Sequence, residues 1–305
     1  MIGTKLAVAA ALLGASAAPA ATHGAAPVLY RLDAGATYQT GCFAPCLCPV
    51  LPEAPVVGTF ELTPGDANSL FHTYDIGDID WTAHTAGTTT RITGSATYRI
   101  GGEVAVEQEM DLALSVGGKP EQKFSSGVVV GGSNFPEISL PVSIHGGVCA
   151  DSIIKIVASP VPPHEIRPYD LGHASAMQRG CFGPCACAIM LPQPLAGSMS
   201  LVELEHGDAQ SQYAVVGMRW HTVSPLPAPA ATTIRGHGLY TIAGATARLM
   251  LELAIGDGDP ASYDSGEQSA AGFPLIDARI SQNGGVCFDT VIDVHAAPRR
   301  GALPR

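Results

Sequence analysis

Strict alternation of apolar and polar residues is the strongest pattern along this chain. It runs over residues 92–100 and again over residues 104–116, and a Gly-Gly pair at 101–102 separates the two runs. A period of two residues places apolar side chains on one face of a strand and polar side chains on the other. The two runs therefore predict a long antiparallel hairpin, with Val104 and Val106 on its buried face.

The chain is duplicated. The segment Gly41–Cys48, which reads GCFAPCLC, returns as GCFGPCAC in Gly180–Cys187, 139 residues later. Trp81 and Trp220, the two tryptophans of the chain, differ by the same 139. Repeats of this length are full domains and not solenoid units. The predicted organisation is a first copy at 26–160, a Pro-rich linker at 161–165, a second copy at 166–298 and a disordered tail at 299–305.

The linker Pro160-Val161-Pro162-Pro163-His164 is expected to be a stiff, extended spacer, because its composition is proline-rich.

The last hairpin of each copy is expected to turn through three residues, Gly146–Val148 in the first copy. This register pairs Ile138 with Ile156 and so brings two apolar faces together. It also places Cys149 and Asp151 on the opposite, polar face.

Each copy accommodates roughly eight strands, and no convincing helical stripe follows the N-terminus. The predicted fold class is all-β, with two tandem homologous antiparallel β-sandwich or β-barrel domains stabilised by disulfides. The pattern does not separate the sandwich from the barrel.

The N-terminus has the pattern of a secretory signal peptide, assigned to residues 1–20. Lys5 precedes an apolar run at 6–13, and Ala18-Pro19-Ala20 resembles a cleavage site. No later apolar run reaches the length of a membrane-spanning helix. The expected product is soluble and exported to the periplasm or the exterior, where disulfides persist.

The charge of the chain argues against two classes of partner. It has 16 basic and 27 acidic residues, for a formal net charge of -11. An acidic, charge-poor chain lacks the basic surface that neutralises phosphates. Nucleic acids and anionic membranes are therefore not expected as partners.

Each copy contains four cysteines in the order C-x3-C-x-C followed by a distant fourth. An even number in an exported chain predicts structural disulfides, and the residues are Cys42, Cys46, Cys48, Cys149, Cys181, Cys185, Cys187 and Cys287. A bond between Cys46 and Cys48 would close a strained ring across one residue. Two pairings stay open: Cys42–Cys46 with Cys48–Cys149, or Cys42–Cys48 with Cys46–Cys149.

The same eight cysteines allow an alternative function in which each set binds Zn or Cu. The spacing fits this poorly, because the second half of each set supplies a single cysteine. No other residues suggest a cofactor.

No recognised catalytic motif follows the signal peptide. The leading hypothesis is a non-catalytic exported protein that serves as a binding, adhesion or envelope-associated module. A further alternative is a hydrolase with a non-standard site, in which a deep pocket of one domain gathers His221 or His237 with nearby acids. Asp75, Asp78 and Asp80 are expected to form a solvated strand face.

Overall fold

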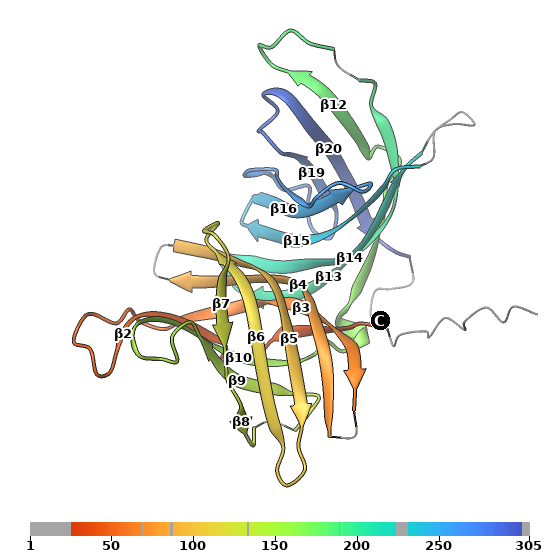
Figure 1. The fold of residues 1–305 in the computed structure, drawn as a ribbon. Coiled ribbons are helices and arrows are strands. Elements are labelled where there is room, and N and C mark those ends of the chain that lie inside the picture. Colours follow the sequence, from red (N-terminus) through yellow and green to blue (C-terminus); the bar gives the residue numbers. More distant parts are fainter. Residues whose placement is uncertain are drawn as a thin grey trace, which may run out of the picture.

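The computed structural model describes residues 26–68, 70–85, 88–132, 134–188, 190–223 and 231–300. The predicted signal peptide at 1–20 lies outside the described residues, as does the tail beyond residue 300. The described chain forms two antiparallel sheets of ten strands each (Figure 1). We call them the first domain (Val28–Pro160) and the second domain (Arg167–Pro298). Within the described ranges, no helix is long and apolar enough to cross a membrane.

The strands of the first domain are β1 (Val28–Leu32), β2 (Thr37–Phe43), β3 (Ala54–Ala67), β4 (Phe71–Thr85), β5 (Thr88–Gly101), β6 (Glu107–Val116), β7 (Gln122–Ser125), β8 (Val129–Val130), β9 (Ile138–Ser143) and β10 (Cys149–Pro160). The short 3-10 helix η1 (Pro163–Glu165) follows. The strands of the second domain are β11 (Arg167–Leu171), β12 (Ala176–Phe182), β13 (Gln193–His206), β14 (Ser211–Thr222), β15 (Thr233–Ala243), β16 (Thr246–Ile255), β17 (Ala261–Asp264), β18 (Gln268–Ser269), β19 (Ile276–Ser281) and β20 (Cys287–Pro298).

Each sheet curls into a near-barrel. Strands β3 to β7 pair in sequence order, β7 meets β9, and β9 pairs with β10. Strand β10 then pairs with both β1 and β2, which pair with β3 and complete the circuit. The second domain repeats these pairings. The fold class is therefore confirmed, and the architecture is an up-and-down near-barrel. Its weak point is the seam between β7 and β9, where only Ser125 and Ser143 are paired.

The predicted long hairpin is β5 and β6, with Ile92 opposite Val116 and Tyr98 opposite Met110. All four of these side chains are buried. The prediction for Val104 and Val106 is wrong, because both are exposed in the loop that precedes β6. Pairing stops where Gly101 faces Glu107, at the rim of the barrel. Apolar alternation continues past the last paired residue and so overestimates the strand.

The closing hairpin has the predicted faces but a different register. Ile138 pairs with Ala158 and Leu140 with Ile156, two residues away from the predicted pairing. A shift of two keeps every apolar side chain on its face, so the pattern alone does not distinguish the two registers. The turn is wider than three residues, and Cys149 within it has a positive φ of 57°.

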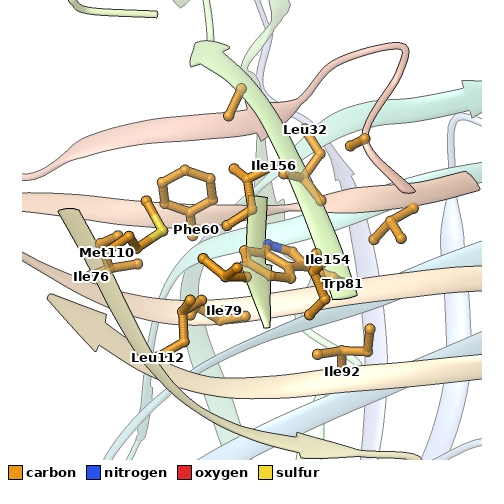
Figure 2. Packing of buried hydrophobic residues seen from close by; sticks show 14 of the residues in the cluster. Leu32, Phe60, Ile76, Ile79, Trp81, Ile92, Met110, Leu112, Ile154 and Ile156 are labelled. Atoms are coloured by element: carbon orange, nitrogen blue, oxygen red, sulfur yellow. The ribbon is translucent and has the colours of Figure 1, made fainter. Parts of the chain in front are cut away.

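A tryptophan lies at the centre of each core. Figure 2 shows Trp81 among Ile79, Ile92 and Ile154, and Trp81 is 1% exposed. Its cross-strand partner is Gly58, where an added Cβ would lie 2.3 Å from the Asp80 carbonyl oxygen.

The second domain repeats the pairing of tryptophan and glycine, with Gly197 opposite Trp220. A Cβ at Gly197 would lie 2.2 Å from the carbonyl oxygen of Arg219. In both domains, therefore, the tryptophan faces a glycine on the neighbouring strand, where a larger side chain would not fit.

The segment between the domains is packed and not simply extended. Val161 is buried, and Pro163–Glu165 forms one turn of 3-10 helix. At the other end of the second domain, Arg299 donates hydrogen bonds from its guanidinium to Asp170. The first residue of the segment assigned to the tail is thus held against β11.

Candidate functional site

Two disulfides close one end of each domain. They join Cys42 to Cys48 and Cys46 to Cys149 in the first domain, which is the second of the two pairings left open by the sequence. The second domain repeats them as Cys181–Cys187 and Cys185–Cys287. We call each set of two disulfides with its two loops the braced end. It comprises residues 41–52 and 144–151 in the first domain and residues 180–192 and 282–289 in the second.

Disulfide formation removes the thiolates on which the metal alternative depends. Every one of the eight sulfurs is in an S–S bond. In the described part of the chain, no group of three or more His, Cys, Asp or Glu side chains is placed to hold a metal ion.

The cysteine loop is positioned by strand pairing. Strand β2 runs antiparallel to β10, so that Phe43 lies opposite Cys149 at the barrel end. The loop then folds back, and Gly41 bridges to Val50. Gly41 has a φ of +149°, and a Cβ there would lie 2.6 Å from the Val50 Cα. Glycine is required at this position because backbone approaches backbone.

A buried carboxylate organises the second loop. The Asp151 side chain is fully buried and accepts backbone N–H bonds from Ile144, His145, Gly147 and Ser152 at 3.0, 3.0, 2.6 and 2.7 Å. The alternation of β10 places Asp151 on the face opposite Ile154 and Ile156, as predicted, but its carboxylate is buried there and not exposed to solvent. The carboxylate is buried because four backbone N–H groups of the turn and of β10 converge on it.

Asp289 performs the same task in the second domain. It accepts N–H bonds from Gln282, Asn283, Gly285 and Thr290 at 3.2, 3.1, 2.7 and 2.6 Å. The sequence carried a signal for this role, since the aspartate is repeated two residues after each distant cysteine.

The cysteine loop of each braced end is uncharged, and each end exposes large apolar side chains. Neither cysteine loop, residues 41–52 or 180–192, contains Asp, Glu, Lys or Arg. The exposed large apolar side chains there are Leu47, Val50, Leu51 and Val148 in the first domain and Met190, Leu191, Val286 and Phe288 in the second. Phe288 is 68% and Leu191 86% exposed. In Figure 1 the loop after β2 lies at the left of the molecule and the loop after β12 at the top, so the two ends face different directions.

A groove follows the weak seam of each near-barrel. In the first domain it has a volume of about 720 Å³ and is lined in part by Asp75, Asp111, Lys123 and Ile144. The corresponding groove of the second domain, about 440 Å³, includes Asp264 and Arg279.

The strand edge at each seam is blocked in a different way. In the first domain β9 carries Pro141, which has no N–H to offer. In the second domain Arg279 occupies the matching position, and the Gln268 side-chain amide bonds both its N–H and its carbonyl. Both devices discourage the addition of an extended peptide strand.

The two histidines named by the sequence lie in different surroundings. His221 is exposed on β14. His237, on β15, faces the other domain, with Nδ1 3.4 Å from Asp78 Oδ1. Asp80 is buried and binds Arg91 through both carboxylate oxygens at 2.7 and 2.9 Å. The prediction of a solvated face is therefore wrong for Asp80 and incomplete for Asp78.

Comparisons with protein-family models, with curated proteins and with solved structures found no match for this chain.

Proposed function

We propose that this chain is an exported, non-catalytic binding protein that docks partner proteins through its two braced ends. The observation that carries the proposal is that both copies expose large apolar side chains at the same doubly cross-linked end, next to an uncharged cysteine loop. Exposed apolar patches rimmed by polar surface are typical of interaction sites. The partner chemistry that suits such an end is an uncharged apolar protein surface.

The bracing itself favours binding. Ordering a flexible loop on association costs about 0.5–1.5 kcal/mol per side chain immobilised. Disulfides to Cys149 and Cys287, with the carboxylates of Asp151 and Asp289 beneath, restrict both loops before any partner arrives. Two such ends on one chain, facing different directions, allow it to link two partner molecules.

Photo-crosslinking in the producing organism tests the proposal. A photoreactive side chain is placed at Leu47 or Leu191 on the braced ends, and at Lys155 or Glu267 as exposed controls. The expected result is discrete covalent adducts with another protein from the two end positions and none from the controls. Polar substitution of the neighbouring Val148 or Val286 should reduce the yield at the same end.

Two outcomes would refute the proposal. One is the absence of adducts at both ends in folded, correctly oxidised protein. The other is equal labelling at the ends and at the control positions, which would indicate random collision.

A further inference from the structure

The two domains meet through a small apolar contact. It consists of Val161, Val202, Ala214 and Val216, with Leu29, Ile166 and Leu204 packed at its border. A cavity of about 440 Å³ beside it, lined by Arg31, Glu165 and Glu203 among others, shows that the contact is not close-packed throughout. Because this apolar contact is small, we expect the polar contacts around it to determine how the domains are positioned.

Four ionic contacts surround the apolar contact between the domains. Asp78 pairs with His237, Arg91 Nη2 lies 4.0 Å from Glu252 Oε2, and His84 Nε2 lies 3.9 Å from Glu205 Oε2. The fourth joins the first domain to the linker, where Arg31 donates to Glu165 at 2.6 Å. Two of the four need a protonated imidazole.

His237 occupies the most enclosed position of this set. Its side chain is 14% exposed, and Nε2 has no hydrogen-bond partner in the described structure. Acidic and basic side chains face it from every neighbouring strand. They are Glu61 on β3, Asp78 and Asp80 on β4, Arg91 on β5, Arg219 on β14 and Glu252 on β16.

This cluster contains four carboxylates and two guanidinium groups besides His237. A protonated imidazole brings the charges closer to balance, whereas a neutral one leaves an excess of carboxylates around a partly buried site.

The cluster belongs to the contact and not to the duplicated domain. By strand register, Ser95 opposite Ala113 stands in the first domain where His237 opposite Glu252 stands in the second. The first domain therefore has no counterpart of His237 and Glu252.

Asp78 itself has an unusual backbone. Its φ is +50°, in the left-handed region, and Gly217 with φ +59° occupies the matching bulge of the second domain. A non-glycine residue in this region is uncommon, and aspartate is among the few that tolerate it. The carboxylate of this residue is the one that reaches across to His237.

We propose that His237 and Asp78 form a proton-dependent latch, which holds the second domain against the first while the imidazole is charged and releases it as the pH rises. The latch lies at the contact between the domains, and its action does not depend on what the braced ends bind.

The direction follows from the groups around the imidazole. Burial alone would lower the pKa of His237, but the hydrogen bond to Asp78 and the carboxylates of Asp78, Asp80 and Glu252 outweigh it and raise the pKa above 6.5. The hydrogen bond from His237 conversely lowers the pKa of Asp78. The charged pair is thus complete between the lowered pKa of Asp78 and the raised pKa of His237. Its contribution is lost as the pH rises through the raised pKa of His237, and again in acid as Asp78 protonates.

Small-angle X-ray scattering of the full chain between pH 6 and pH 9, with NMR titration of the histidine rings, tests the latch. The expected result is an increase in the radius of gyration with a midpoint at the measured pKa of His237. His237→Gln should show the larger radius at every pH. His237→Lys should keep the smaller radius through pH 9, because a lysine ammonium titrates near 10.4.

Asp78→Asn guards against a folding defect, because asparagine accepts the left-handed backbone at this bulge. It should lower the pKa of His237 and move the scattering transition to lower pH. His221→Gln, which removes an exposed imidazole outside the cluster, should behave as the wild type. A wild-type radius that does not change between pH 6 and 9, or a transition that persists in His237→Gln, would overturn the proposal.

Discussion

Asp151 offers the sharpest test of how the braced end is built. Its fully buried carboxylate accepts four backbone N–H bonds of 2.6–3.0 Å from the turn that carries Cys149. Replacing it with alanine removes this acceptor from all four donors, of which Ile144 N–H keeps a second acceptor, the Ser152 carbonyl oxygen at 3.3 Å. A hydrogen bond to a charged group contributes about 1.5–3 kcal/mol, so four bonds set an upper bound of about 12 kcal/mol.

The expected loss is smaller than that bound, because the glycine-rich turn is partly exposed and water can reach some of the freed N–H groups. We expect Asp151→Ala to lower the free energy of unfolding of the first domain by about 3–4 kcal/mol. Asp151→Asn retains one acceptor oxygen and should lose about half as much. Asp111→Ala, an exposed aspartate on β6, serves as the matched control and should change stability by less than about 0.5 kcal/mol.

Each domain has one buried tryptophan, which makes the assay specific. In a Trp220→Phe background, fluorescence of Trp81 during urea unfolding under oxidising conditions reports the first domain alone. The midpoint and the slope together give the free energy of unfolding. A loss below about 1 kcal/mol for Asp151→Ala would refute the view that this carboxylate organises the turn.

Three further predictions concern other parts of the fold. Removal of the Cys46–Cys149 bond by serine substitution should lower the free energy of unfolding by about 4–5 kcal/mol, and removal of Cys42–Cys48 by about 2 kcal/mol. The difference is expected because loop-closure entropy grows with loop length, and the two bonds span 103 and 6 residues. Equal losses in urea unfolding would contradict this. Gly58→Ala should lower stability by about 2 kcal/mol or more, because its Cβ would strike the β4 backbone. Gly77→Ala, on β4, has no atom within 4 Å of the added Cβ and no positive φ, so it should lose clearly less in the same assay. Burial alone would raise the pKa of Asp264, but hydrogen bonds from Arg248 and Gly266 lower it; the stability this pair adds is present at neutral pH and lost as the pH falls through the lowered pKa. Asp264→Asn should therefore weaken the second domain at pH 7 more than at pH 3, and an equal effect at both values would argue against the pair.

At the braced ends, the sequence predicts that disulfides form but not which cysteines pair. Counting cysteines and noting their repeat predicted disulfides and narrowed them to two pairings per domain. The choice between Cys46 and Cys48 as the partner of Cys149 depends on how the loop folds back at Gly41. That fold-back is a contact between backbones, which apolar and polar patterns do not record.

The surroundings of the acids and histidines likewise could not be predicted from the sequence. His237 and Asp78 lie on different domains, 159 positions apart by their numbers, and meet only because the second domain packs on the first. Asp80 is buried because Arg91, on the neighbouring strand, neutralises it. Their spacing along the chain resembles an ordinary solvated strand face, so no local pattern distinguishes them.

The amino-acid sequence by itself determined the duplication, the all-β class and the buried face of most strands, because these follow from repeats and from a two-residue period that is local. Tertiary structure alone decided the near-barrel closure, the hairpin register, the disulfide partners, the burial of Asp151 and the contact between the domains. Each of these depends on groups brought together from distant positions, where free energy is set by backbone fit, burial and charge rather than by neighbours in the chain.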